Sequence, residues 1–225
     1  KKVQAIHSNE DMTDGEQEQA VVDLDDEFGE HVKNLFLQVP GFDGHLHTPV
    51  EILHVWLLGI VKYTYHNAMN GMKAIAKESL MAQWAAFDTS GLDIPPIIPK
   101  TMYQHYNSLV GKEFCVILQA APFVLFEDLP KNKQPMWIVL CHLGSYIFET
   151  EFCDMNTHLA GLHVWIDTFL CEMVKLNAMW TNKPKFHILT HLQDSIALFG
   201  PASLFATEKF ESYNANTCSA SVHSN

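Results

Sequence analysis

Apolar residues recur along most of this chain at intervals of three and four, which is the period of an amphipathic helix. The clearest stretch covers residues 156–179, with apolar side chains at Leu159, Leu162, Ile166, Phe169, Leu170, Met173 and Val174. Strict alternation of apolar and polar residues, which indicates a half-buried strand, is almost absent. The pattern predicts a mainly α, multi-helix globular fold, with a flexible N-terminus at residues 1–15 and a single domain at 16–225.

About eight helices are expected, joined by short connections. They span roughly 16–37, 47–69, 72–87, 111–130, 135–148, 156–179, 184–200 and 202–214, with a further short helix from Thr101 to about Gly111. Three prolines between residues 92 and 100 predict an extended connection there. Within 111–130, Pro122 predicts a kink or a break, and two short buried strands remain the alternative for this stretch.

The expected helix at 47–69 is apolar nearly all round and should therefore be central and buried. Its first residues resemble a capping box, with Thr48 as the N-cap and Glu51 reaching back to it. Glu51 and His54 lie near the first turn, and Glu211 lies on the apolar C-terminal segment. Capping explains Glu51 and simple exposure explains Glu211. Alternatively, the two glutamates meet as metal-binding carboxylates.

Charge limits the possible partners of the chain. Among 225 residues the formal net charge is −12, and all fourteen basic residues are lysines. Arginine is the usual side chain for gripping phosphates and guanine edges, and a protein that neutralises several phosphates needs a basic face. This acidic, arginine-free chain is therefore not expected to bind DNA tightly by itself.

The cysteines and the hydropathy pattern indicate the compartment. The five cysteines are odd in number, widely spaced and free of C-x-x-C pairs, which favours free thiols in a reducing environment. No signal peptide and no membrane-spanning run is recognised. An intracellular location without a membrane partner is expected.

Two further groups contain metal-ligating residue types. The acidic run Asp23–Glu27, with Asp25 and Asp26 at its centre, resembles the magnesium-binding cluster of a metal-dependent all-helical enzyme, although a solvated helix face is the favoured interpretation. His187 and His191 are four residues apart on one expected helix, a spacing that suits a metal. Buried, hydrogen-bonded core histidines are the favoured interpretation of this pair.

Several long stretches carry a resemblance to a known family. They are GFDGHLHTPVEILHVWLLGIVKY, GKEFCVILQAAPFVLF, KPKFHILTHLQDSIALFGPASLFATEKFESYNA and the closing SVHSN. Together they resemble proteins encoded by fungal transposons of the Kyakuja–Dileera–Zisupton (KDZ) type, over about residues 34–225.

This resemblance implies a cut-and-paste DNA transposase of the DDE class, acting in the nucleus on DNA. Such enzymes use an RNase H-like fold in which carboxylates hold two Mg²⁺ or Mn²⁺ ions for phosphodiester attack. The family's second acid and following histidine match Glu51 and His54, and its third acid matches Glu211. These three residues are therefore the implied metal ligands, with Glu51 and Glu211 as the catalytic pair. Residues 70–185 match an inserted helical domain.

The chain also departs from the family pattern. The second acid is expected as aspartate, the first acid has no candidate, and relatives continue beyond SVHSN. We therefore expect a fragment or degenerate form that retains the helical part, with at most remnants of the RNase H-like fold, and that has lost strand transfer. The alternatives are a helical interaction or scaffold module that binds a protein partner or another copy of itself, and the metal-dependent helical enzyme with the Asp23–Glu27 cluster.

Overall fold

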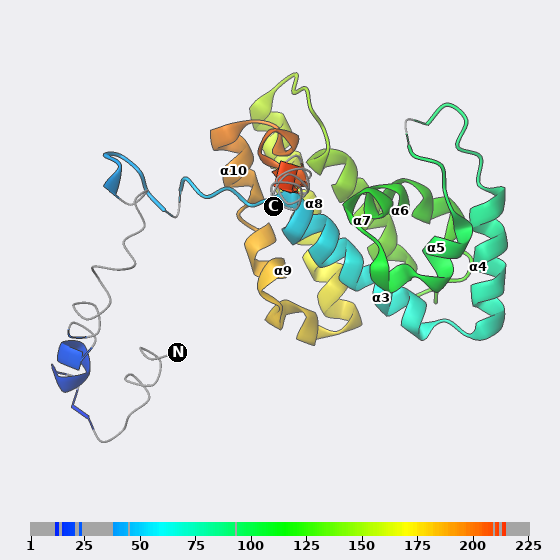
Figure 1. Cartoon of the computed structure of the whole chain (residues 1–225), viewed down its shortest axis with the longest axis horizontal. Coiled ribbons are helices and arrows are strands. Elements are labelled where there is room, and N and C mark those ends of the chain that lie inside the picture. Colours follow the sequence, from blue (N-terminus) through cyan, green and yellow to red (C-terminus); the bar gives the residue numbers. More distant parts are fainter. Residues whose placement is uncertain are drawn as a thin grey trace, which may run out of the picture. The chain divides into compact units, whose positions relative to one another are not determined.

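The computed structural model describes residues 12–13, 15–20, 23, 38–44, 46–92, 94–208, 210–211 and 213–214. Contacts divide the chain into two compact units, Lys1–Thr48 and Pro49–Asn225. Within the described residues the regular structure consists of helices and includes no strand (Figure 1). The predicted mainly α fold is confirmed.

In the N-terminal unit, residues 15–20 and Asp23 are helical. Thr13 opens this helix, because its backbone N–H and its hydroxyl each lie 2.8 Å from the Glu16 carboxylate. These hydrogen bonds hold the pKa of Glu16 below its ordinary value. A turn follows at residues 38–44, where Gly41 adopts a positive φ of 81° that other residues rarely adopt.

The second unit contains most of the helices. In chain order they are the π-helix η2 (Leu53–Val61), α3 (Lys62–Gly71), α4 (Ala74–Ala86), α5 (Pro99–Gln104), the 3₁₀-helix η3 (Tyr106–Ser108), α6 (Gly111–Val124), α7 (Gln134–Ile147), α8 (Met155–Leu176), the 3₁₀-helix η4 (Ala178–Asn182), α9 (Pro184–Leu189), α10 (Leu192–Phe199) and the 3₁₀-helix η5 (Ala202–Phe205).

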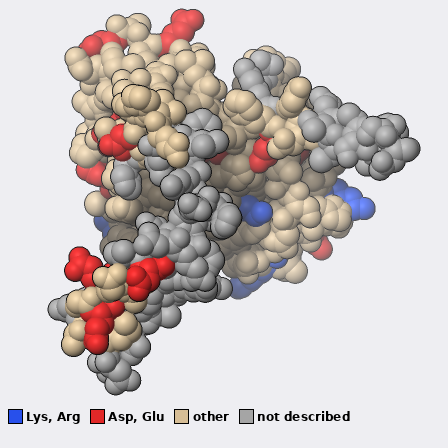
Figure 2. Space-filling view, turned by 60° about the vertical axis from the view of Figure 1, so that its left-hand side comes forward, with Lys and Arg blue, Asp and Glu red and all other residues tan. Residues whose placement is uncertain are grey.

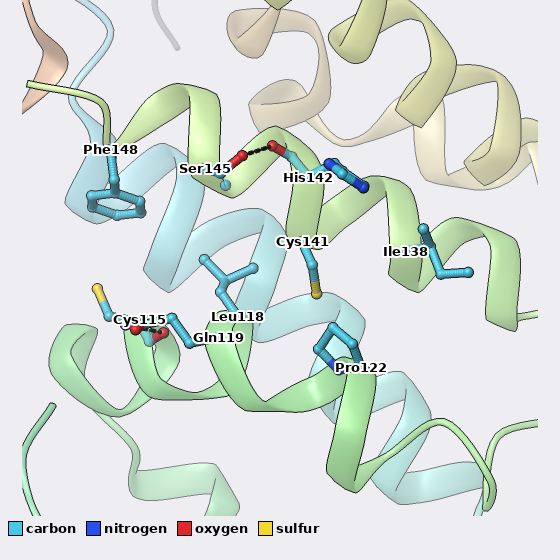
Figure 3. Close-up of a pocket in the computed structure, with 10 residues that line it drawn as sticks. Cys115, Leu118, Gln119, Pro122, Ile138, Cys141, His142, Ser145 and Phe148 are labelled. Atoms are coloured by element: carbon cyan, nitrogen blue, oxygen red, sulfur yellow. Dashed lines mark hydrogen bonds between the residues drawn. The ribbon is translucent and has the colours of Figure 1, made fainter. Parts of the chain in front are cut away.

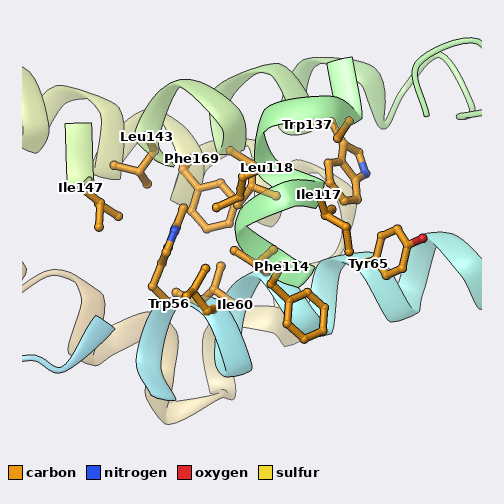
Figure 4. Close-up of a cluster of buried hydrophobic side chains, with 14 of the residues drawn as sticks. Trp56, Ile60, Tyr65, Phe114, Ile117, Leu118, Trp137, Leu143, Ile147 and Phe169 are labelled. Carbon is orange, nitrogen blue, oxygen red and sulfur yellow. The ribbon is translucent and has the colours of Figure 1, made fainter. Parts of the chain in front are cut away.

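The helix formed by η2 and α3 lies at the centre of this unit, as its apolar sequence predicts. Trp56, Ile60 and Tyr65 from this helix are fully buried. Figure 4 shows these side chains facing residues of α6 and α7 and the ring of Phe169 from α8. Edge-to-face contacts join Trp56 to Phe169, with ring centroids 6.1 Å apart, and Tyr65 to Trp137 at 6.5 Å.

Helix α6 settles the alternative left open by its sequence. It remains one helix from Gly111 to Val124, and Pro122 lies inside its last turn. Glu113 secures the start of the helix, because its carboxylate accepts the Val110 backbone N–H at 2.9 Å. The two-strand interpretation of this stretch is therefore wrong. A proline so close to the end of a helix removes one hydrogen bond without interrupting the turns before it.

The stretch predicted as one helix at 184–200 is divided into α9 and α10. At the break, the backbone N–H groups of Thr190 and His191 donate to carbonyls three residues earlier, at 3.0 Å each. The Thr190 hydroxyl also donates to the His187 carbonyl at 2.7 Å. These tight local hydrogen bonds compete with the α-helical ladder, and the chain changes direction there.

Candidate functional site

Glu51 stands directly before the central helix and caps it. One carboxylate oxygen, Oε1, accepts the backbone N–H of Leu53 at 2.7 Å, and the other, Oε2, accepts that of His54 at 2.8 Å. The predicted N-cap at Thr48 is wrong, because the Thr48 hydroxyl donates to the Gly44 carbonyl instead. Residues 49–51 before the helix are not helical, and the Val50 backbone N–H donates to the Ser195 hydroxyl at 3.0 Å.

The same carboxylate also contacts the C-terminal segment. Oε1 accepts the Thr207 N–H at 2.9 Å, and Oε2 lies 2.8 Å from Nδ1 of the His54 ring. Burial raises the pKa of Glu51, but the hydrogen bonds from Thr207, His54 and Leu53 together outweigh it and leave the pKa below its ordinary value. Each oxygen of Glu51 therefore has two hydrogen-bond donors.

His54 connects Glu51 to Glu211. Its Nδ1 contacts Glu51, and its Nε2 lies 2.9 Å from Oε1 of Glu211. Both contacts are hydrogen bonds at the same time only when both ring nitrogens carry a hydrogen, that is, when the imidazole is a cation. The His54 and Glu211 side chains are each 51% exposed. We call Glu51, His54, Thr207 and Glu211 the clasp.

Lys185 fixes helix α9 to the same turn of the central helix. Its Nζ donates to the His54 carbonyl at 2.6 Å. Gly59 makes this approach possible, because a Cβ atom there would lie 2.5 Å from Cδ of Lys185. Neither Lys185 nor Thr207 is recognisable as a site residue from the sequence, because each reaches His54 or Glu51 from a distant part of the chain.

The clasp does not fit a metal ion as it stands. A metal-binding Glu51 would have to release at least one of the four donors that its oxygens now accept, and His54 would have to release a carboxylate from a ring nitrogen. Within the described residues, no group of three or more His, Cys, Asp and Glu side chains is placed to hold a metal. The structure thus brings the predicted Glu51, His54 and Glu211 together, but through hydrogen bonds to one another.

The other sequence candidates have different outcomes. Asp25, Asp26 and Glu27 lie outside the described residues, whereas Asp23 is exposed on its helix and accepts Gln19 Nε2 at 2.8 Å.

The predicted His187–His191 pair straddles the break between α9 and α10. Its rings meet edge to face, with centroids 5.1 Å apart. Both histidines are exposed, so the prediction of buried core histidines is wrong. Phe186, Leu189 and Leu192 fill the core side of this segment, which leaves both histidines on its outer face.

A second feature is an open apolar groove between α6 and α7, with a volume of about 750 Å³. Figure 3 shows the side chains of the two helices facing each other across it. It is lined by Cys115, Leu118, Gln119, Pro122, Ile138, Cys141, His142, Gly144, Ser145 and Phe148. The spacing of three, four and seven residues on each helix is visible in the sequence, but which helix lies opposite is not.

The two thiols in this groove behave as apolar groups. Burial raises the pKa of Cys115 to about 12, with a further contribution from the charge of Glu208. Burial alone raises the pKa of Cys141 to about 12. Both thiols therefore stay protonated near neutral pH, and the groove carries no charge from them.

Comparison with known proteins adds no relative. No protein-family profile, no curated protein and no solved structure matches the chain. Among the described helices, none combines the length and apolarity that crossing a bilayer requires.

Proposed function

We propose that this protein is a transposase-derived helical binding module in which the residues matching the family's acids serve as a structural clasp. The proposal rests on the resemblance to KDZ-type proteins and on the hydrogen bonds of Glu51. A carboxylate that caps a helix and also holds Thr207 stabilises the fold. Strand transfer would need the same oxygens for metal ions. The nucleus is the compartment that a transposase origin favours.

A calorimetric titration with Mn²⁺ and Mg²⁺ tests whether the clasp binds the metal ions that strand transfer requires. The wild type and the variants Glu51→Gln and Glu211→Gln are expected to give the same heats, without saturable binding. Metal binding to the wild type that both variants abolish would contradict the proposal. That result would favour the second candidate, a metal-dependent DNA strand-transfer enzyme. The observation in favour of this candidate is that both matching glutamates contact the two nitrogens of one imidazole.

The proposed binding role rests on the groove between α6 and α7. Its two walls are helical stripes, Cys115–Pro122 on α6 and Ile138–Ser145 on α7. At 1.5 Å per residue each wall is about 10 Å long, which is two turns of a helix. His142 is held at the rim, because its ring stacks on Trp165 with centroids 4.8 Å apart.

The chemistry of the walls selects an apolar helix of a partner protein as the occupant. None of the described residues that line the groove is acidic or a lysine, so the groups facing them should also be uncharged. An elongated apolar groove between two helices accepts a third helix through side chains three, four and seven residues apart. The partner helix is therefore expected to carry one uncharged apolar stripe about two turns long.

A displayed library of amphipathic helical peptides tests this groove. Ile138 lines it and is 42% exposed, so Ile138→Glu adds a charge there with little effect on the core. Val164 on α8 is 62% exposed and does not line the groove, so Val164→Glu is the matched control. The wild type and the control should enrich peptides with an apolar stripe, and Ile138→Glu should not.

Equal enrichment by all three proteins, or none by the wild type, would refute the groove as the binding surface. Light scattering after gel filtration addresses self-association. A dimer that Ile138→Glu dissociates and Val164→Glu leaves intact would identify a second copy of the chain as the occupant, against the partner helix proposed here.

A further inference from the structure

A small polar pocket lies where α3, the start of α7 and the end of α8 meet. Its volume is about 180 Å³, roughly that of six water molecules at about 30 Å³ each. It is lined by Thr64, Asn67, Asn132, Lys133, Met136, Met173, Leu176, Asn177 and Trp180. Three amides, one hydroxyl and one ammonium group line it, and none of these lining residues is acidic.

Two asparagine side chains at this pocket accept hydrogen bonds through their carbonyl oxygens. The Asn67 carbonyl oxygen accepts the Lys133 ammonium at 2.9 Å. The Asn177 carbonyl oxygen accepts the Met179 backbone N–H at 2.9 Å. In both amides the acceptor oxygen is thus engaged, and the NH₂ group remains to donate. With the remaining hydrogens of Lys133, the pocket offers several donors and a positive charge.

One more lysine, Lys183, adjoins the pocket through Trp180. The Lys183 ammonium lies 5.5 Å from the Trp180 ring centroid and 4.6 Å from that of Tyr63. Lys185 also lies over the Tyr63 ring, at 5.7 Å. Among the described residues, Lys133, Lys183 and Lys185 make no ion pair with a carboxylate.

This lack of ion pairs is unexpected from the composition, because acidic residues outnumber lysines by 26 to 14. Figure 2 shows one face of the molecule, where the lysines (blue) lie at separate places among acidic side chains (red) and form no broad basic field. The single ammonium of Lys133 in the pocket, with Lys183 beside Trp180, therefore favours one compact anion over an extended polyanion.

We propose that this pocket binds a phosphate group, held by the NH₂ groups of Asn67 and Asn177 and by the ammonium of Lys133. Lys183 adds long-range attraction beside Trp180 at its rim. A phosphate has several acceptor oxygens, and charge-assisted hydrogen bonds from amides and an ammonium match them. The group can belong to a free phosphorylated molecule or to a nucleic-acid backbone. This inference does not depend on the role proposed for the clasp or for the groove.

Asn177→Asp is the sharpest variant. Aspartate accepts the Met179 N–H as asparagine does, so the turn into η4 is retained. The pocket, however, loses an NH₂ donor and gains a negative charge. Asn156→Asp is the matched control, because Asn156 is exposed in the first turn of α8, outside the pocket lining, and the charge change is the same. Lys133→Met is a second variant that keeps the aliphatic stem, with Lys112→Met as its control at an exposed lysine.

The measurement is a titration of ¹⁵N-labelled protein with inorganic phosphate, followed through the side-chain NH₂ signals. Saturable shifts are expected in the wild type. Asn177→Asp and Lys133→Met should weaken the affinity about tenfold or more, because each removes a hydrogen bond to a charged group. Both controls should stay within about twofold of the wild type.

A parallel titration with a short single-stranded oligonucleotide distinguishes the two sources of phosphate. Much tighter binding of the oligonucleotide, lost in Asn177→Asp, would assign the site to a nucleic-acid backbone. Binding of inorganic phosphate without this gain would assign it to a small phosphorylated molecule. An unchanged NH₂ spectrum in the wild type, or an equal loss in Asn156→Asp and Asn177→Asp, would overturn the proposal.

Discussion

Replacing Glu51 by glutamine separates a structural clasp from a pair of catalytic acids. The Glu51 side chain is only 17% exposed, and its carboxylate accepts three backbone N–H groups and one imidazole nitrogen. Glutamine keeps the length of the side chain and one acceptor oxygen. Its NH₂ group, however, would face hydrogen-bond donors, so about half of these contacts become repulsive.

The expected loss follows from these contacts. A lost helix cap costs about 0.5–2 kcal/mol, and a lost hydrogen bond to a charged group about 1.5–3 kcal/mol. The contact with the half-exposed His54 adds less than about 1 kcal/mol. Since glutamine retains one oxygen, we expect Glu51→Gln to lower the free energy of unfolding by about 2–3 kcal/mol at pH 7.

Glu211→Gln is the matched comparison, because the same chemical change removes only one contact of a half-exposed side chain. It should lower the free energy of unfolding by less than about 1 kcal/mol. Urea denaturation followed by tryptophan fluorescence measures both, since Trp56 is buried in the helix that Glu51 caps. The structural role of Glu51 is refuted by equal losses in the two variants, or by a Glu51→Gln variant as stable as the wild type.

Three further predictions use the same structure. Folding lowers the pKa of Glu51, so the ionised carboxylate stabilises the folded state above the ordinary pKa of 4.5, and this stabilisation is lost as the pH falls below that value. Acid denaturation should therefore be less steep in Glu51→Gln than in the wild type. Identical acid profiles would contradict this. Gly59→Ala should cost about 1–3 kcal/mol in chemical denaturation, because its Cβ would meet a backbone oxygen at 2.8 Å, whereas Gly71→Ala, with its nearest contact at 3.8 Å, should cost little. Mass-spectrometric mapping of thiol alkylation at pH 8 should find the exposed Cys153 modified before the partly buried Cys141, whose pKa is raised to about 12. The reverse order would contradict the raised pKa of Cys141.

The helical class and most helix positions follow from the sequence alone. A three-to-four spacing of apolar residues is a local property of the sequence. It places these residues on one face of a helix, and packing that face against other helices removes it from water. The central helix at η2 and α3 was predictable for the same reason. The break at Thr190 was not predictable, because the apolar positions of residues 184–200 fit one continuous helix as well as two shorter ones.

The cap at Glu51 also escaped prediction, because the sequence predicts Thr48 as the N-cap and Glu51 only as its partner in the capping box. In the structure the backbone N–H of Val50, between these two residues, donates to the distant Ser195 hydroxyl, and the helix begins only after Glu51. A local pattern gives several acceptable hydrogen-bond schemes, and only the packing of distant segments selects one.

The contacts of the candidate side chains depend on how distant helices pack. The sequence placed Glu51, His54 and Glu211 as residues that a metal could bind, but it could not reveal that Thr207 occupies one oxygen of Glu51. Nor could it bring Asn67, Lys133 and Asn177 to one pocket, since they lie on three different helices or their ends. Residue types determine which contacts are chemically possible, and the packing of the helices determines which groups are close enough to make them.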